Sequence, residues 1–294
     1  MNRHEQAEKS FKEIHSLIGM DELKLKVEHL RRFKENSDKH AITDVTLPNY
    51  LWVAKRGGGV TTSVSVLAEY LFHEKIIDFT GDVKFLEFKL SYNPNDEMFY
   101  ELTRLNNTIS EIAGHHRYFR GILCLNIDEW VSHTKDPNFY KLLDFISNKN
   151  DKILAILYVH NQDKKVIENL ESDLSAHIRF ESLWLRFPNT DELLELIDTK
   201  YFKRDGFYLS SDAKNILRES IEEIVKGKNF NGFHTIRQLA SDIIYGLLTA
   251  DMKDFEISAE ELSTFNKDSA YVKRIKAFVG NTKMMGFSTT TEEN

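Results

Sequence analysis

The chain has 294 residues, of which 41% are hydrophobic and 29% charged, and its formal net charge is -7 at pH 7. This length predicts one large domain together with a small one, and the acidic balance disfavours a nucleic-acid-binding protein, since such proteins concentrate Lys and Arg. The single cysteine, Cys124, excludes an internal disulfide and favours a reducing compartment. The first ten residues lack an apolar segment and no run of 18 apolar residues occurs, so we expect a cytoplasmic protein without a secretory signal or a membrane span.

The first part of the chain predicts strands that alternate with helices. It opens with two helices, Gln6 to Ile18 and Asp21 to Phe33, which are separated at Gly19 and carry apolar residues at three- and four-residue spacing. Short apolar or alternating runs then predict strands, with helical patterns between them. The predicted strands are 50–54, 84–90, 121–127, 152–159 and 178–185, and the helices between them are 61–72, 95–112 and 139–146. This alternation predicts an α/β fold with a doubly wound parallel sheet.

After Pro188 the sequence predicts helices and no further strands. Capping residues and apolar periodicity indicate helices over 190–202, 210–225 and 233–249. We therefore expect an α/β domain over 1–188, a small helical lid domain over 189–265 and a polar tail over 266–294. The tail contains one modest helical pattern, at 271–278, and its last residues, 288–294, are expected to be disordered.

Three consecutive glycines (57–59) separate the first predicted strand from its helix. A glycine-rich turn at this place binds phosphate through backbone N–H groups and the helix dipole. Aligned with the phosphate-loop pattern G-x-x-x-x-G-K-[ST], the segment has Ala54 at the first glycine and Val60 at the lysine, and it keeps the second glycine and Thr61. The predicted phosphate-binding residues are Gly57, Gly58, Gly59, Val60, Thr61 and Thr62.

Asp128 and Glu129 directly follow the apolar strand predicted over 121–127. In phosphate-loop enzymes such an Asp orders Mg²⁺ and the adjacent Glu polarises the attacking water. A carboxylate pair can also cap a strand, and a glycine turn can lack a ligand, but the order of the two signals favours a nucleotide pocket. Without a lysine at position 60 a transferred phosphoryl group loses a principal stabiliser. Lys55 or Arg56 replaces that lysine in one interpretation, and both are solvated loop cations in the other.

Taken together, these residues resemble the AAA+ superfamily, and within it the CbbX-like (red-type Rubisco activase) and SpoVK-like group, from roughly Phe11 to Phe265. Residues 17–24 (LIGMDELK) are similar to the family's opening segment, whose Ile-Gly pair contacts adenine; that pair is Ile18 and Gly19 here. His160 or Asn161 stands at the place of the family's sensor-1 residue. Each segment alone also fits a helix break or a strand cap, and their order along one chain favours the resemblance.

The sequence departs from the family pattern at charged positions. In 231–237 (NGFHTIR), which resembles the start of the third lid helix, His234 replaces the sensor-2 arginine and Arg237 lies one turn further on. Asp173 occupies the position of the arginine finger, with Arg179 and Arg186 nearby.

The resemblance implies ATP or ADP with Mg²⁺ as cofactors, held between the two domains. It implies Thr61 and Asp128 as metal ligands, and it implies that Asp128, Glu129 and Asn161 carry catalysis, while Ile18, Gly19, His234 and Arg237 contact the nucleotide. A ring or filament and a protein partner are also implied. The altered positions favour binding with weak or lost hydrolysis. An active ATPase, a nucleotide-free adaptor subunit and, more weakly, a DNA-remodelling role remain alternatives.

Overall fold

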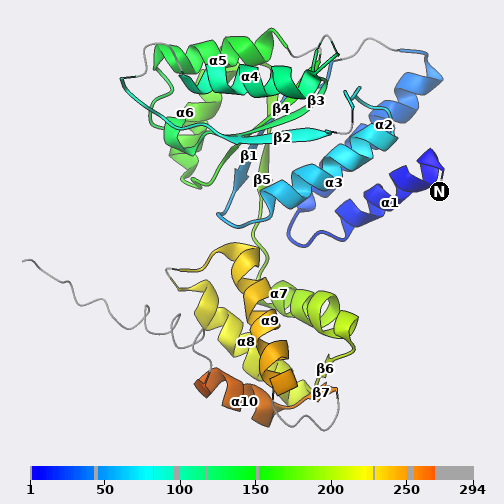
Figure 1. Ribbon diagram of the computed structural model, residues 1–294, viewed down its shortest axis with the longest axis vertical. Coiled ribbons are helices and arrows are strands. Elements are labelled where there is room, and N and C mark those ends of the chain that lie inside the picture. The colour runs from blue at the N-terminus through cyan, green and yellow to red at the C-terminus, as the bar shows by residue number, and fades with distance from the viewer. Residues whose placement is uncertain are drawn as a thin grey trace, which may run out of the picture. The chain divides into compact units, whose positions relative to one another are not determined.

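A computed structural model describes residues 2–42, 46–81, 83–95, 100–116, 118–149, 152–227, 229–249 and 255–268 (Figure 1). The chain forms two compact units, Met1–Phe187 and Pro188–Asn294. The first contains the large parallel sheet and the second contains mainly helices.

A five-stranded parallel sheet organises the first unit, with the strand order β2-β3-β4-β1-β5. The strands are β1 (Asn49–Ala54), β2 (Phe85–Lys89), β3 (Gly121–Asn126), β4 (Ile153–Val159) and β5 (Phe180–Leu185). β1, β3 and β4 are buried along their whole length, which explains their nearly continuous apolar sequences. All five predicted strands are present within two residues of their predicted ends.

Helices cover both faces of this sheet. They are α1 (Arg3–His15), α2 (Asp21–Lys39), α3 (Val60–His73), α4 (Tyr100–Ala113), the short η1 (Asp128–Trp130), α5 (Pro137–Ser147) and α6 (Lys164–Ser175). One continuous core joins α4, α5 and α6 to the face that carries Leu51, Leu123 and Leu157. α3 contacts β2, β3 and α1, and α2 packs on α1 and β5. The predicted doubly wound α/β class is confirmed.

No helix is predicted above for residues 164–175, yet the structure has α6 there. Asp163 caps its first turn by accepting a hydrogen bond from the N–H of Val166 at 3.1 Å. Ile167, Leu170 and Leu174 recur at three- and four-residue spacing and are buried. The helical periodicity is therefore present in the sequence. The predicted helix over 95–112 begins at Tyr100 in the structure, and residues 96–99 lie outside the described residues.

The second unit combines helices with one small pair of strands. It contains α7 (Thr190–Leu196), a π-helical turn η2 (Ile197–Phe202), η3 (Lys203–Asp205), β6 (Tyr208–Leu209), α8 (Ser211–Val225), α9 (Gly232–Thr249), β7 (Glu256–Ile257) and α10 (Ala259–Asp268). The prediction that strands end at Pro188 is wrong, because β6 and β7 pair in parallel. Each is two residues long, too short to show an alternating pattern.

Two further details of the second unit differ from the sequence-based expectation. The single helix predicted over 190–202 changes to π-helical geometry at Ile197. α10 has no counterpart among the predicted helices, and it extends past residue 266, where the polar tail is expected to begin. Residues 269–294, which include the helical pattern at 271–278, lie outside the described residues.

Asn49 is a buried polar residue at the start of β1 that ties this strand to both of its neighbours. Its side-chain oxygen accepts a hydrogen bond from the N–H of Ala155 in β4 at 3.0 Å, and its amide nitrogen donates to the carbonyl of Arg179 beside β5 at 3.3 Å. Only 1% of Asn49 is exposed. A buried amide that satisfies backbone groups on two strands fixes their register.

Replacing Asn49 with Leu should lower the free energy of unfolding by about 1–3 kcal/mol, because the N–H of Ala155 loses its buried partner. All three tryptophans, Trp52, Trp130 and Trp184, belong to the first unit, so urea unfolding followed by tryptophan fluorescence reports on it. The matched control is Asn107→Leu on the exposed side of α4, which should change stability by less than about 0.5 kcal/mol. Equal losses in both variants would contradict the role given to Asn49.

Candidate functional site

The glycine loop joins the carboxyl end of β1 to the start of α3. Gly57 and Gly59 adopt φ values of 69° and 83°, a left-handed region that favours glycine. The N–H of Gly58 donates to the carbonyl of Lys55 at 2.8 Å, and a Cβ at Gly58 would lie 2.7 Å from that same oxygen. The three glycines are therefore required by a tight turn, whatever the turn binds.

The start of α3 is suited to an anion. Within the described part of the chain no side chain caps this helix, and its first turn contains no acidic residue. Its first N–H groups thus keep their hydrogen-bonding capacity and the positive end of the helix dipole is not neutralised. Thr61 and Thr62 are exposed there, whereas Val60 is buried, so the lysine position supplies an apolar side chain to the core instead of a charge.

A carboxylate that the sequence analysis did not select, Glu87 of β2, holds Thr61. The Thr61 hydroxyl donates to Glu87 Oε1 at 3.1 Å, and the Tyr158 hydroxyl of β4 donates to the same oxygen at 2.9 Å. Burial, followed by the hydrogen bond to Glu87, raises the pKa of Tyr158, so its hydroxyl remains a donor. A hydroxyl that gives its proton to a carboxylate keeps its lone pairs for a cation.

Asp128 lies at the carboxyl end of β3 and is held by His160 at the end of β4. Its two oxygens are 2.6 Å from the His160 backbone nitrogen and 2.6 Å from His160 Nδ1. The side-chain amide of Asn126 donates to Asp128 Oδ2 at 3.1 Å. Burial alone would raise the pKa of Asp128, but these hydrogen bonds outweigh it and hold the pKa below its ordinary value. Asp128 is therefore a fixed carboxylate at this edge.

Glu129 is turned toward β2. Its carboxylate forms an ion pair with Lys89 at 2.7 Å and accepts the N–H of Tyr92 at 3.1 Å. The hydrogen bond from Lys89 and then that from Tyr92 lower the pKa of Glu129. A carboxylate with a lowered pKa, already paired with a lysine, is a weak general base.

The structure separates the two sensor-1 candidates. His160 contacts Asp128, whereas the side chain of Asn161 accepts the N–H of Asp163 at 2.8 Å in the turn that starts α6. Asn161 thus serves the turn, and His160 faces the carboxylate.

The predicted adenine-side residues precede α2. Gly19 is buried with a φ of 74°, and Ile18 is half-buried beside it. α2 starts against β5, since Glu22 accepts the N–H of Trp184 at 2.5 Å. Trp184 pairs with Val53 near the end of β1, so the first turn of α2, which Ile18 and Gly19 precede, lies at the edge that carries the glycine loop.

The loop cations are exposed, and the finger candidates have contacts of their own. The Lys55 ammonium lies 5.4 Å from the centre of the Phe187 ring. Asp173 accepts the Thr134 hydroxyl at 2.6 Å and forms an ion pair with Lys135, and these contacts lower its pKa. Of the remaining cations, Arg56 is exposed beside Lys55, and Arg186, directly after β5, contacts Asp21 at 3.1 Å. Arg179 precedes β5 and contacts the Thr46 carbonyl at 3.5 Å, so it lies at the end of the sheet opposite the glycine loop.

His234 and Arg237 belong to the second unit. Both are exposed on α9, one turn apart, while their neighbours Thr235 and Ile236 are buried. The positive charge of Arg237 opposes the rise that burial causes in the pKa of Tyr201.

The residues of the first unit are better suited to bind phosphate groups than to bind a metal ion without phosphate. The uncapped amides of α3 fit a phosphate, and the oxygens of Thr61 and Asp128 have the hard-donor chemistry that Mg²⁺ prefers. Among the described residues, no group of three or more His, Cys, Asp or Glu side chains is arranged to hold a metal. A magnesium ion here would therefore depend on phosphate oxygens and water for most of its ligands.

Comparisons with known proteins support the fold. No family profile and no curated protein matches the chain. Among solved structures, a point mutant of Thermotoga maritima RuvB aligns with 14% identity and a TM-score of 0.52, covering 86% of this chain and 71% of its own. C. elegans PCH-2 aligns with 13% identity and a TM-score of 0.53, covering 92% of this chain and 72% of its own. At this level of identity the likeness concerns the fold: the chain shares with these two structures a parallel α/β sheet flanked by helices.

None of the helices in the described part of the chain has both the length and the apolar content of a membrane span.

The pH dependence of stability tests the network around Asp128. Because its pKa is lowered by folding, Asp128 stabilises the protein above its ordinary pKa of 3.8, and that stabilisation is lost as the pH falls through the lower folded value. The unfolding free energy of Asp128→Asn should therefore lie below that of the unchanged protein at about pH 6, and the gap should narrow toward about pH 3. Urea unfolding at several pH values measures this. A gap independent of pH would contradict the assignment.

Proposed function

We propose that this chain is an AAA+ type nucleotide-binding protein that holds ATP or ADP on the glycine loop and has weak or lost hydrolysis. The observation that carries the proposal is the uncapped start of α3 directly after a glycine turn, at the sheet edge where Asp128 follows β3. Parallel strands bring their carboxyl ends to one edge, which is where open α/β sheets bind ligands. The AAA+ fold supports the choice of a nucleotide over another anion.

The phosphates would be bound by backbone N–H groups from Gly57 to Thr62. When bound, Mg²⁺ would neutralise phosphate charge, with Thr61 and Asp128 as its protein ligands. Glu87 orients the Thr61 hydroxyl so that its lone pairs remain available. On the adenine side we propose Ile18 and Gly19, while a role of His234 and Arg237 toward the nucleotide stays a prediction from the resemblance.

Two observations support weak or lost hydrolysis. Val60 is buried where a phosphate loop has its lysine, so one stabiliser of transition-state charge is missing. Glu129 is paired with Lys89, so the base expected to activate water has a lowered pKa and would first have to break this ion pair. Catalysis by Asp128, Glu129 and Asn161 would require another cation in place of the missing lysine and release of Glu129 from Lys89. The side chain of Asn161 is itself engaged, because it accepts the N–H of Asp163.

The protein would act on a protein partner through nucleotide-dependent assembly with further copies or related subunits, in the cytoplasm. Asp173 supplies no cation at the finger position, and its carboxylate is held by Thr134 and Lys135 of the same chain. An assembly built from this chain alone would therefore lack an arginine contribution from that position. This favours binding and release over turnover as the source of any conformational change.

A nucleotide-free adaptor subunit is the second candidate. It is favoured by the closed contacts Glu87–Thr61 and Lys89–Glu129, which give these four side chains partners without a ligand. The two candidates differ in one measurable property, the response of the folded protein to nucleotide.

ADP with Mg²⁺ should raise the melting temperature of the first unit by about 5 °C or more at a concentration about 100 times Kd, because a ligand that binds only the folded state stabilises it. Tryptophan fluorescence reports on this unit. Gly58→Ala should abolish the shift, since its Cβ would force Lys55 away and deform the turn. Gly114→Ala is the matched control, a positive-φ glycine whose Cβ would meet nothing closer than 3.9 Å, and it should keep the full shift.

An unchanged melting temperature with ADP or ATP at millimolar concentration would reject the nucleotide pocket and favour the adaptor. A shift that survives Gly58→Ala would place the nucleotide elsewhere. Because each variant is compared with itself in the absence of nucleotide, a lower starting stability does not affect the comparison.

Glu87→Gln should reduce the gain in nucleotide affinity that Mg²⁺ provides. The carboxylate places negative charge beside Thr61, so it opposes free phosphate and favours a bound cation. The variant should bind Mg²⁺-free ADP several-fold more tightly and show a smaller improvement when Mg²⁺ is added, as measured by titration calorimetry. Gln can still accept the Thr61 hydrogen bond, so the change tests charge. An unchanged magnesium dependence would remove Glu87 from the site.

A further inference from the structure

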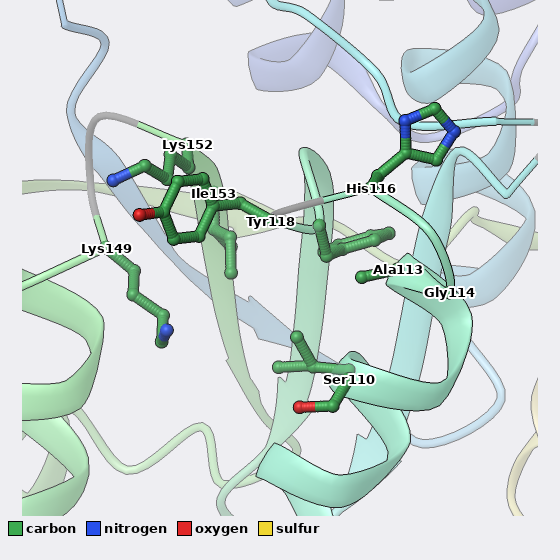
Figure 2. A pocket seen from close by; sticks show the side chains of 10 residues that line it. Ser110, Ala113, Gly114, His116, Tyr118, Lys149, Lys152 and Ile153 are labelled. Atoms are coloured by element: carbon green, nitrogen blue, oxygen red, sulfur yellow. The ribbon is translucent and has the colours of Figure 1, made fainter.

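A pocket lies at the edge of the sheet opposite the glycine loop, where β3 and β4 begin. Its volume is about 250 Å³. It is lined by Ile109, Ser110, Ala113, Gly114, His116, Tyr118, Phe119, Lys149, Lys152 and Ile153. Figure 2 shows Lys149 and Lys152 on one side of it and the residues of α4 and the following turn on the other. Because β4 is seven residues long, this edge is roughly 20 Å from the glycine loop.

The pocket has an apolar floor and a polar rim. Ile109, Ala113, Phe119 and Ile153 are each no more than 6% exposed. The rim consists of exposed Ser110, Gly114, His116 and Tyr118 and the two half-buried lysines. Among the described lining residues two carry a positive charge and none carries a carboxylate. An apolar floor beneath a cationic rim suits a ligand with an apolar body and an acidic group.

Backbone hydrogen bonds fix the two lysines relative to each other. The carbonyl of Lys149 accepts the N–H groups of Lys152 at 2.9 Å and Ile153 at 2.8 Å, which closes the turn between α5 and β4. The Lys152 ammonium lies 4.5 Å from the centre of the Tyr118 ring, so this charge is positioned over an aromatic ring at the rim. Lysines after a helix also stabilise its negative end. That effect explains Lys149 after α5, but it does not explain why Lys152 is placed over Tyr118 at the rim.

The pocket continues beyond Tyr118. A neighbouring hollow of about 310 Å³ shares His116 and Tyr118 with it. Its other described walls are Asp78, Phe79, Thr80 and Arg120, and Arg120 is paired with Asp78 at 2.5 Å. The two charged side chains of this second hollow are thus paired with each other.

We infer that the pocket at the start of β3 and β4 binds an organic anion, an aromatic or branched apolar group that carries a carboxylate or phosphate. The apolar group rests on Ile109 and Ile153, and Lys149 and Lys152 bind the acidic group. Two sources share this chemistry: a small free acid, and the C-terminal residue of a peptide. The site is independent of nucleotide binding on the other edge of the sheet.

Methyl NMR of the full chain with labelled isoleucine tests the inference with benzoate as the probe. The Ile109 and Ile153 methyl signals should shift with a saturable dependence at about 10 mM benzoate or below, as expected for so small a ligand. The Ile221 methyl, in α8 of the second unit, should not move. Benzyl alcohol, which has the ring without the charge, should bind several-fold more weakly.

The double variant Lys149→Glu/Lys152→Glu should weaken benzoate binding by at least about tenfold, since both charges reverse beside the carboxylate. Lys141→Glu is the matched control, an exposed lysine on α5 outside the pocket. Ser110→Trp gives an independent variant that fills the pocket from an exposed helical position and should abolish binding without a change of charge. Circular dichroism verifies that each variant is folded.

The inference is overturned if benzoate shifts neither methyl signal up to about 50 mM, a concentration well above the Kd expected for a ligand of this size. It is also overturned if Lys141→Glu weakens binding as much as the double variant. The source of the anion is decided by a second titration, with a tripeptide ending in phenylalanine and with its C-terminal amide. Tighter binding of the free-acid peptide than of benzoate assigns the pocket to a protein C-terminus. Tighter binding of benzoate assigns it to a small free acid.

Discussion

The parallel pairing of β3, β4 and β1, in that order, is the constraint on which the rest of this molecule depends. The three strands are buried throughout, so burial of apolar side chains fixes their order and register. Their carboxyl ends then meet at one edge, with Asp128 after β3, His160 after β4 and the glycine loop after β1. The Asp128–His160 hydrogen bonds fasten the first two of these ends together. The positions of the candidate functional groups are thus consequences of the core.

The electrostatics of this edge separate binding from turnover. The start of α3 provides positive potential through backbone groups alone, a feature that suits the phosphate binding we propose. Two groups would be expected to accelerate phosphoryl transfer. The lysine of the phosphate loop is replaced here by the buried, apolar Val60, and the carboxylate of Glu129 is already paired with Lys89. Under the function we propose, such a site would respond to the presence of a nucleotide more readily than it would consume one. The function we propose is compatible with that behaviour, because nucleotide-dependent assembly needs differential binding and does not require chemistry at every site.

Much of the fold could be predicted from the sequence, because its signals are local. Apolar runs marked the strands, and three glycines marked the loop. The pair β6 and β7 was missed because two-residue strands have no period. Glu87 was missed for a different reason: it is one charged residue in an alternating strand, and its partners Thr61 and Tyr158 meet it only through the β2-β3-β4 order. Likewise, sequence order could not decide between His160 and Asn161, since the choice depends on which side chain the end of β4 turns toward Asp128.

The central claim is that backbone amides of the glycine loop hold the phosphates of a nucleotide. A crystal structure of the full chain grown with ADP and Mg²⁺ tests it most directly. The account predicts phosphate oxygens at about 3 Å from backbone nitrogens between Gly57 and Thr62, with Val60 still in the core. A loop that stays empty at saturating ADP, or a nucleotide bound elsewhere on the protein, would contradict it.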